Sequence, residues 1–344
     1  MPTIFELVSS PEIVSYWETL TQDRAPFLGE TLFPNDKKLG LDLKWLKGSS
    51  GLPVVLKPSA FDAAAVLRPR INFDKLSAEM PFFKESMAID EALRQELNMV
   101  LETGNTTYID AIMNRVFKDD TTLLEAAAVR REQMRMMMLT TGAISITANG
   151  QDYDFDYQLP EDHKQTVGTS WSNTDADIIN DIRTWQDKIE DDTGVRPTRA
   201  ICSRKTWGYI LKNTAIRNGI LGNDSAAFVS DAQVEQFMLN ALNLSVEIYT
   251  KRYINDAGES TQYVADDIFV IFPEGDLGNT WFGTTPEESD LMASNVANVT
   301  LTDTGVAVTT MEKADPVNVE TKVTMVCLPD FPTADQVFIA DVIA

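Results

Sequence analysis

The chain contains one histidine, His163, so a Ser-His-Asp or Cys-His catalytic arrangement would have to use that residue. His163 lies in the polar stretch PEDHKQT, which favours a solvent-exposed loop. The two cysteines, Cys202 and Cys327, are far apart and form no CxxC motif. Because free cysteine behaves as a small hydrophobic residue, we expect two buried thiols, with neither a zinc site nor a disulfide framework.

Two short motifs could bind phosphate or calcium. The GSSG segment at 48–51 is not followed by the Gly-Lys-Ser/Thr that a phosphate-binding loop requires. Asp152, Asp154 and Asp156 have the spacing of a calcium loop, but glycine is missing from the sixth position, and His163 stands where the bidentate Glu belongs. The alternation of these aspartates with aromatic residues instead predicts the exposed face of a strand.

Adjacent carboxylates are the remaining candidates for acid/base chemistry. Such pairs are favoured at helix N-termini and in turns, so their presence does not by itself indicate catalysis. None forms a recognisable acid/base pair, and we expect no enzyme activity and no catalytic, metal-binding or cofactor-binding residues. The pairs are Asp119/Asp120, Asp191/Asp192 and Glu287/Glu288.

Charge is distributed unevenly along the chain. From Lys37 to Arg70 there are seven basic residues against Asp42 and Asp62, which is +5, so the other residues sum to −28 within the total of −23. Wrapping of nucleic acid is disfavoured, because each phosphate contact needs a cation. An acidic surface also serves solubility, the simpler interpretation of the charge alone. A basic, Gly- and Pro-interrupted segment beside an acidic body predicts contact with another copy of the chain.

The chain of 344 residues is long enough for about two domains. Its 44% hydrophobic and 24% charged residues are typical of a folded protein with a core. No apolar run approaches the ~20 residues of a membrane-spanning helix, and the N-terminal residues do not have the pattern of a signal peptide. We therefore expect a protein that is made and kept in a cytoplasm.

The first third of the sequence predicts extended structure. Residues 1–36 have short apolar clusters interrupted by Pro11 and Pro26, which favours an arm with at most a short helix that packs on neighbours more than on itself. From Leu41 to Phe73, alternating apolar positions around a turn-rich tip predict a long two-stranded excursion. An isolated hairpin is only marginally stable, so the excursion needs a partner surface.

A helical period follows between Glu85 and Gly142. It predicts one helix that ends at Gly104 and a second over residues 108–117. After a polar turn, Thr122 opens a capping box and a third helix that continues to Gly142.

The second half of the chain alternates between strands and helices. The Asn149-Gly150 turn predicts a half-buried antiparallel hairpin. From Trp171 an α/β pattern predicts a helix capped within 172–174 and ending at Gly194, then further elements. These are strands at 199–202, 246–250 and 268–272, a helix capped by Ser203, a loop at 213–225, and a helix at about 231–242. The alternation over 317–327 predicts a long antiparallel strand that pairs with the hairpin around Asn149.

This order of segments resembles the major capsid protein E family of tailed bacteriophages, the family of the lambda major head protein. The resemblance spans almost the whole chain and is carried by five segments, each moderately specific alone and strong in this order. They are GLDLKWLKGSSGLPVVLKPSAFDAAAVLRPR (40–70), MPFFKE (80–85), GTSWS (168–172), PTRAICSRKTWGYIL (197–211) and PEGDLGNTWFGTTPEE (273–288).

The resemblance implies the Hong Kong 97 capsid fold, an α+β fold. Its parts are an N-terminal arm, an extended E-loop, a peripheral P-domain with a spine helix and long antiparallel strands, and an α/β A-domain near the capsomer centre. The spine helix would be the one that ends at Gly142. Carried onto this sequence, the arm is 1–40, the E-loop 41–75, the P-domain 76–168 and 284–330, and the A-domain 169–283 and 331–344.

The resemblance also implies three regions of contact between subunits. The E-loop candidates are Lys44, Trp45, Lys47, Lys57, Phe61, Arg68 and Arg70; those of the N-arm are Trp17 and Phe27; those of the axial loop of the A-domain are Asn218, Asn223 and Asp224. Some capsids of this fold form Lys–Asn isopeptide crosslinks. Lys57 is a candidate lysine, but no acid to catalyse the bond is evident, so we expect no crosslink.

We therefore hypothesise that the chain is the major capsid protein of a tailed bacteriophage, a part of the virion capsid assembled in the bacterial host cytoplasm. Its copies would form hexamers and pentamers of an icosahedral shell around double-stranded DNA, without sequence-specific DNA binding or a membrane. Scaffold, portal and decoration or stabilising proteins are the expected partners. Two alternatives remain: an encapsulin-like nanocompartment shell subunit, and a soluble acidic-site hydrolase or binding protein.

Overall fold

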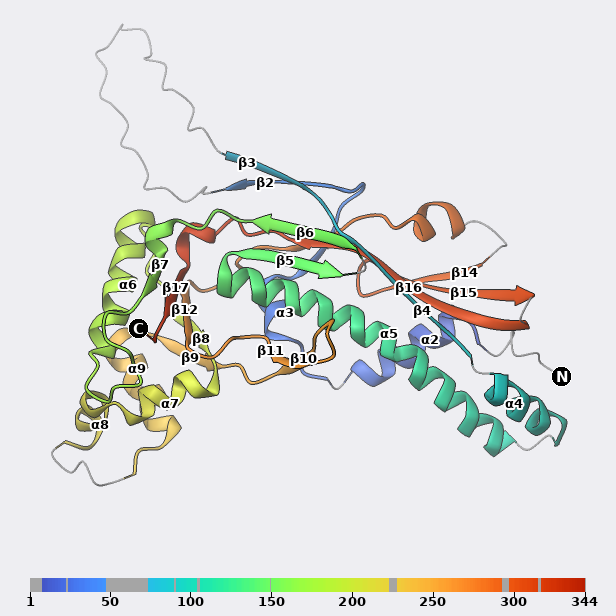
Figure 1. The fold of residues 1–344 in the computed structure, drawn as a ribbon, viewed down its shortest axis with the longest axis horizontal. Coiled ribbons are helices and arrows are strands. Elements are labelled where there is room, and N and C mark those ends of the chain that lie inside the picture. Colours follow the sequence, from blue (N-terminus) through green and yellow to red (C-terminus); the bar gives the residue numbers. More distant parts are fainter. Residues whose placement is uncertain are drawn as a thin grey trace, which may run out of the picture. The chain divides into compact units, whose positions relative to one another are not determined.

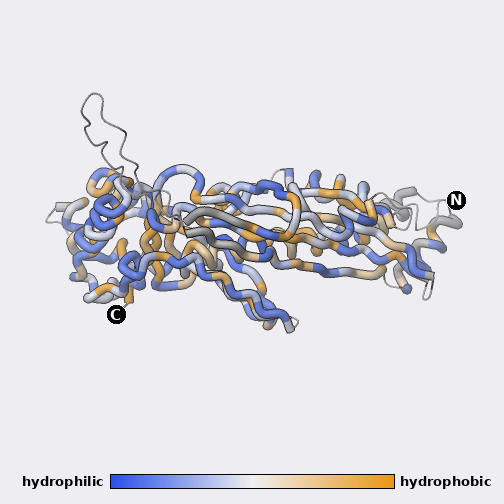
Figure 2. Tube along the Cα trace, turned by 90° about the horizontal axis from the view of Figure 1, so that it is seen from above, coloured by the Kyte–Doolittle hydropathy of each residue, from blue (hydrophilic) through white to orange (hydrophobic). Residues whose placement is uncertain are grey.

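The computed structural model describes residues 8–22, 24–47, 74–89, 91–103, 106–148, 150–222, 228–292, 297–314 and 317–343. The chain forms two compact units, each built from segments that are distant in sequence (Figure 1). Unit 1 comprises Met1–Leu43, Ala78–Arg135 and Asn279–Asp330, and unit 2 comprises Lys44–Ser77, Met136–Gly278 and Phe331–Ala344. Hydrophobic and hydrophilic residues alternate along the chain (Figure 2). This is expected of amphipathic helices and strands, which bury one face and expose the other.

Among the described residues, the N-terminal part of unit 1 contains helices α2 (Ser10–Thr21) and α3 (Leu28–Leu32). Pro11 lies in the first turn of α2, where its missing N–H removes no helical hydrogen bond. Ile13 and Trp17 are one turn apart and both buried. The Ser10 hydroxyl donates to Asn298 Oδ1 at 3.0 Å. This segment therefore packs on its own chain, contrary to the expectation of an arm that packs mainly on neighbours, because the two apolar side chains share one helix face.

One six-stranded sheet organises unit 1, in the order β1-β13-β16-β15-β14, with β4 also paired to β16. The long strand β16 is confirmed, but its predicted pairing with the hairpin around Asn149 is wrong. Its register with β15 reaches from Val306↔Met325 to Ala314↔Val317, so it pairs with its neighbour in sequence, which requires less loop closure. The strands are β1 (Asn35–Lys37), β4 (Phe82–Ala88), β13 (Thr280–Phe282), β14 (Asn298–Thr302), β15 (Val306–Ala314) and β16 (Val317–Pro329).

The segment after Pro81 is a strand, β4, where the sequence predicted the start of a helical region at Glu85. Phe82 and Phe83 favour extended structure, and β4 pairs antiparallel with β16 through Phe83↔Met325. Helix α4 (Glu91–Thr103) begins only after this strand.

Helix α5 (Thr106–Thr141) is continuous, so the predicted break before Thr122 is wrong. The Thr121 hydroxyl donates to the Lys118 carbonyl at 3.0 Å, and the Thr122 hydroxyl donates to the Asp119 carbonyl at 2.6 Å. Both threonines therefore bond back along the helix instead of capping a new one. The helix ends as predicted at Gly142, whose φ of +76° suits glycine.

Unit 2 contains a five-stranded sheet in the order β7-β17-β12-β8-β9. The central strand β12 is antiparallel to both of its neighbours, while the pairs β7/β17 and β8/β9 are parallel. The strands are β7 (Lys164–Thr166), β8 (Arg199–Cys202), β9 (Ser245–Ile248), β12 (Ile268–Phe272) and β17 (Phe338–Asp341).

The helices of unit 2 are α6 (Ile178–Thr193), α7 (Arg204–Lys212), α8 (Thr214–Leu221) and α9 (Asp231–Leu242). Gly194 ends α6 and Ser203 caps α7, as predicted. The cap of α6 is Asp177, not a residue of 172–174. Part of the predicted loop at 213–225 is helix α8, because the Asn213 side chain accepts from the Ile216 N–H and supplies a cap.

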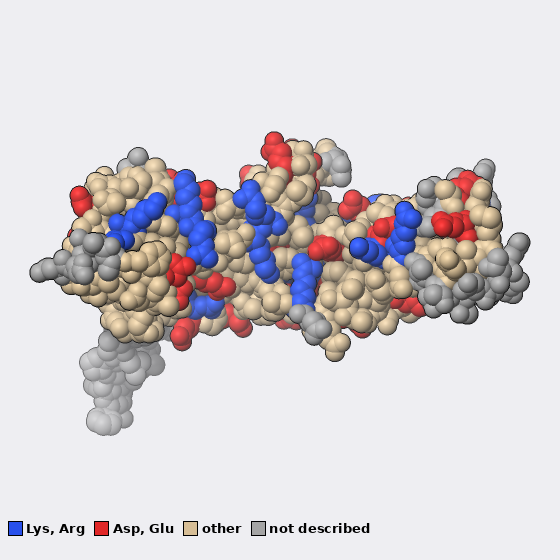
Figure 3. All heavy atoms as spheres, turned by 90° about the horizontal axis from the view of Figure 1, so that it is seen from below, with Lys and Arg blue, Asp and Glu red and all other residues tan. Residues whose placement is uncertain are grey.

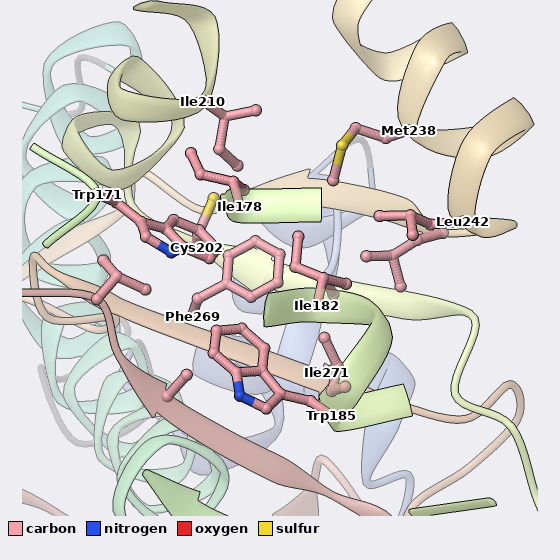
Figure 4. Packing of buried hydrophobic residues seen from close by; sticks show 14 of the residues in the cluster. Trp171, Ile178, Ile182, Trp185, Cys202, Ile210, Met238, Leu242, Phe269 and Ile271 are labelled. Carbon is pink, nitrogen blue, oxygen red and sulfur yellow. The ribbon is translucent and has the colours of Figure 1, made fainter. Parts of the chain in front are cut away.

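Aromatic and aliphatic side chains fill the core of unit 2 (Figure 4). The ring of Trp171 lies 5.7 Å from that of Trp185 and 5.2 Å from that of Phe269. Met238 and Leu242 of α9 belong to the same buried cluster. This core holds the helices against β8 and β12, which are buried almost throughout.

Three two-stranded sheets complete the fold. The predicted hairpin is confirmed as β5 (Ala143–Ala148) paired with β6 (Gln151–Asp156). Its aspartates are exposed, whereas Tyr153 and Phe155 are half-buried. The other two sheets pair β2 (Asp42–Lys47) with β3 (Asp74–Glu79), and β10 (Arg252–Ile254) with β11 (Ser260–Gln262).

Candidate assembly surface

His163 is buried, with 1% of its surface exposed, and not in an exposed loop as predicted. Its Nε2 lies 2.9 Å from Asp192 Oδ2, and its ring stacks on Phe338 at 6.0 Å. Lys188 Nζ lies 2.7 Å from both Asp192 and Asp162, and hydrogen bonds from Lys188 and then His163 lower the pKa of Asp192. The residues next to His163 in sequence are polar and gave no indication that Phe338, which is distant in sequence, covers its ring.

Both cysteines are buried and free, as predicted. Burial raises the pKa of the Cys202 thiol to about 12 and that of Cys327 to about 11. Both thiols therefore stay protonated at neutral pH and are poor nucleophiles and metal ligands.

The three pairs of adjacent carboxylates lie on three different elements of the fold. Asp120 is buried on α5, and burial raises its pKa to about 7, while Asp119 beside it is exposed. Burial alone would raise the pKa of Glu287, but hydrogen bonds from Lys322, the backbone and Thr324 outweigh burial. The net effect is a pKa below the usual value. Among the described residues, no three His, Cys, Asp or Glu side chains are placed to hold a metal ion. Nor does any described helix have the length and apolarity needed to cross a membrane.

The predicted excursion has a paired stem. Lys44, Trp45 and Lys47 lie in β2, which pairs with β3. The other four E-loop candidates, Lys57, Phe61, Arg68 and Arg70, lie outside the described residues. At the base of the stem, the Met80 N–H donates to the Leu41 carbonyl at 2.9 Å. The stem pairs with no other strand in the described part of the chain.

Apolar side chains are exposed before the stem and along strand β4. Leu39 is 85% exposed, and Leu41, Phe82 and Met87 are also exposed. The last two lie on β4, which pairs with β16 alone among the described strands, so alternate backbone N–H and C=O groups of β4 face away from the sheet. Exposed apolar side chains beside a free strand edge are typical of a surface that another chain covers.

The two N-arm candidates are buried in their own chain. Trp17 and Phe27 both lie in the core of unit 1. The Arg24 guanidinium is 4.9 Å from the centre of the Phe27 ring, and it also lies 3.4 Å from Glu125. Little of either aromatic surface is therefore left for a second copy.

Only one of the three axial-loop candidates lies within the described residues. Asn218 is exposed on α8, whereas Asn223 and Asp224 lie outside the described residues. Phe228 is 88% exposed and Leu239 of α9 is exposed too. Sequence reasoning missed Phe228; the signal was a single large aromatic residue directly after the Asn- and Gly-rich segment.

Charges of both signs occur on the molecular surface. The face drawn in Figure 3 carries Lys and Arg side chains together with Asp and Glu, within a protein whose net charge is −23. Mixed charge and exposed apolar groups suit repeated contacts of moderate strength between copies.

The paired stem, the 36-residue helix α5, the long strands of unit 1 and the α/β unit together define a protein of the Hong Kong 97-like fold. The chain belongs to the phage major capsid protein E family, whose model matches residues 9–342. No curated protein matches the chain.

Three solved structures illustrate the fold. A protein of an Escherichia coli CFT073 prophage, assigned as a capsid protein, has a TM-score of 0.61 at 14% identity, covering 97% of this chain and 99% of that chain. A phage-related protein of Bordetella bronchiseptica RB50 has a TM-score of 0.57 at 13% identity, covering 97% of each chain. The capsid protein of cyanophage A-1(L) has a TM-score of 0.52 at 11% identity, covering 92% of each chain. At these identities the likeness establishes the fold.

Family membership gives the chain a structural role in the virion capsid, in which copies of the chain form a shell. The predictions of family, of the α+β fold and of a capsid function are therefore confirmed.

Proposed function

We propose that this chain forms hexamers and pentamers of an icosahedral shell, that the shell assembles in the bacterial host cytoplasm and encloses double-stranded DNA, and that the chain has no enzyme activity. Support comes from its family and from the charge of its excursion. Scaffold, portal and decoration or stabilising proteins are its proposed partners.

The observation that carries the proposal is the stem of β2 and β3. A two-stranded ribbon has too little buried surface to be stable alone, so it needs a covering surface. The segment from Lys37 to Arg70, which contains strand β2 of this stem, carries +5, whereas the remainder of the chain carries −28. The acidic body of a neighbouring copy supplies the complementary charge.

Two further contacts complete the proposed shell. One contact surrounds the axis of the hexamer or pentamer. It involves the axial-loop candidates Asn218, Asn223 and Asp224, and we add the exposed Phe228 to this set. The N-terminal segment with Trp17 and Phe27 contributes through the residues around these buried rings. Many weak contacts repeated around a ring give avidity without a single tight joint.

The proposed boundaries follow the resemblance: an arm at 1–40, an E-loop at 41–75, a P-domain at 76–168 and 284–330, and an A-domain at 169–283 and 331–344. The shell encloses the DNA without binding it tightly, because a net charge of −23 disfavours contacts with phosphates.

Electron microscopy of the purified protein tests the proposal. We expect closed shells with five-fold and six-fold capsomers, and size-exclusion chromatography that separates shells or capsomers from single chains. A preparation that stays monomeric at high concentration, and binds a small ligand instead, would contradict it.

A further inference from the structure

Backbone hydrogen bonds hold the base of the stem within unit 1. Strand β1 pairs parallel with β13, with Lys37 opposite Phe282. The next residue, Lys38, donates its N–H to the Phe282 carbonyl at 2.8 Å, and the Met80 N–H donates to the Leu41 carbonyl at 2.9 Å. Both ends of the excursion therefore start from fixed backbone.

Two glycines allow the close approach at this base. A Cβ on Gly283 would lie 2.7 Å from the Gly40 carbonyl oxygen and 2.8 Å from Val326 Cγ1, closer than real Cβ contacts. Gly40 itself has a φ of +92°, a conformation that other residues rarely adopt. The chain can turn into the stem here because neither position carries a side chain.

One helical turn ties this base to the long strand β16. The turn η2 (Glu287–Leu291) is a π-helix, in which the Met292 N–H donates to the Glu287 carbonyl at 3.0 Å. Short π-helical turns often occur at functional sites. Successive side chains of such a turn point in different directions, so two adjacent glutamates can reach two different elements.

The two glutamates bind different strands. Glu287 lies 2.6 Å from Lys322 Nζ and accepts a hydrogen bond from Thr324 at 3.0 Å, both on β16. Glu288 Oε1 lies 2.5 Å from Lys37 Nζ on β1. The Lys37 and Glu288 side chains are 28% and 18% exposed, so this ion pair is shielded from much of the solvent. Removing one partner would leave a partly buried charge without compensation.

We propose that Lys37, Glu288 and Gly283 form an anchor that fixes the backbone at the base of the E-loop stem, where Leu41 meets Met80, and that they are positioning residues for assembly of the shell. This inference rests on the proposed function, in which the E-loop contacts another copy. Assembly then depends on the anchor even though none of the three residues needs to touch a neighbour.

The geometry of the stem explains why a small change at the anchor has a large effect. Strand β2 has 6 residues and, at about 3.3 Å per residue, is about 20 Å long. A rotation of about 10° at its base therefore moves its far end by about 3 Å, which exceeds the tolerance of a hydrogen bond. The proposed contacts between the E-loop and a neighbouring copy are therefore lost together when the base of the stem rotates.

The test compares variants of the full chain in two measurements. Hydrogen exchange of the unassembled subunit, read by mass spectrometry, reports the amides of Lys38 and Met80. The yield of closed shells reports assembly. The variants are Glu288→Gln, Lys37→Met and the exchanged pair K37E/E288K; the control is Glu125→Gln, which removes the exposed Arg24–Glu125 ion pair of the same unit.

We expect Glu288→Gln and Lys37→Met to speed exchange at the base about tenfold and to lower shell yield about tenfold, because the local opening equilibrium shifts. Exchange in β16 should stay slow, Glu125→Gln should behave as wild type, and K37E/E288K should restore both readouts. A merely structural pair would change exchange without changing shell yield.

Three outcomes would overturn the anchor: wild-type exchange in both single variants, normal shell yield despite faster exchange, or no recovery in a folded K37E/E288K chain. If Glu288→Gln fails to fold, Lys37→Met leaves η2 intact and carries the same test. Salt dependence of exchange at Lys38 and Met80 in the wild type decides the ion pair without any variant, since salt screens it. A wild-type chain that forms no shells contradicts the proposed function, while exchange still decides the anchor.

Discussion

Asp120 is a carboxylate whose charge state is affected by folding. It lies on α5 with 3% of its surface exposed, and burial raises its pKa to about 7, an effect that the Thr321 hydroxyl of β16 offsets in part. The folded state therefore favours the protonated form. Because the folded pKa lies above the unfolded value, this group's stabilising contribution is present at acid pH and is lost as pH rises toward 7.

Replacing Asp120 by Asn should remove this pH dependence. A shift of three pKa units corresponds to at most about 4 kcal/mol, so we expect Asp120→Asn to raise the free energy of unfolding by about 1–3 kcal/mol at pH 8 and to change it little at pH 4. Denaturant titration of the unassembled subunit at both pH values measures this. Asp119→Asn, at the exposed neighbour, is the control; equal effects at both positions would contradict the assignment.

Gly283 and Gly208 should respond in opposite ways to alanine. The added methyl at 283 meets the Gly40 carbonyl at 2.7 Å, so Gly283→Ala should lose about 1–3 kcal/mol through overpacking. Gly208 lies inside α7 with nothing within 4 Å of an added Cβ, so Gly208→Ala should gain up to about 1 kcal/mol of helix propensity. Thermal unfolding of the two variants compares them directly, and a stable Gly283→Ala chain would show that the base can relax.

At the scale of elements, the continuity of α5 shows how short polar segments mislead. Lys118 to Thr121 has the composition of a turn, yet it lies inside a helix of 36 residues. The threonine hydroxyls there bond to carbonyls three residues earlier, which satisfies them without ending the helix. Composition set a weak local preference, and the neighbouring elements of the fold overrode it.

This difference can be measured at one helix cap and at one threonine inside a helix. Ser203 accepts a hydrogen bond from the Thr206 N–H and caps α7, so Ser203→Ala should lose about 1 kcal/mol. Thr122 is exposed and caps no helix, so Thr122→Ala should change stability by less than about 0.5 kcal/mol or increase it. Chemical denaturation of both variants tests this. A large loss at Thr122 would restore the helix boundary that the sequence suggested.

At the scale of the whole molecule, charge asymmetry is the property that matters for assembly. The basic stretch from Lys37 to Arg70 lies in a chain whose other residues sum to −28. Copies therefore repel one another unless this segment meets an acidic surface. Such attraction is screened by salt over about 8–10 Å at physiological ionic strength.

Reversing the charge of the loop should therefore impair assembly without unfolding the subunit. We expect K44E/K47E/K57E to lower the yield and the salt resistance of shells about tenfold or more, since several attractive contacts per subunit become repulsive. The matched control R115E/K118E/K212E makes the same change in net charge at exposed positions outside the loop. Light scattering and electron microscopy measure shell yield, and unchanged yield in the loop variant would refute the charge argument.

Local patterns predicted a large part of the fold. The unbroken apolar run of β12, the helical spacing of Ile178, Ile182, Trp185 and Ile189 in α6, and the Asn149-Gly150 turn each predicted the observed element. These signals are local, because the residues that share a face lie two to four positions apart in sequence. The candidate site was predicted less completely, since the only signal for Phe228 was a single aromatic residue after the Asn- and Gly-rich segment, and the pairing of Lys37 with Glu288 gave no local signal.

The sequence by itself determined the family, the two buried thiols and the basic excursion, because order of segments, residue type and charge are properties of the chain. Tertiary structure decided which distant segments meet. It buried His163 beneath Phe338, placed Trp17 in its own core, and gave β16 the partners β15 and β4 in place of the hairpin. Each of these outcomes depends on competition between surfaces far apart in sequence, and burial free energy is settled only when those surfaces are brought together.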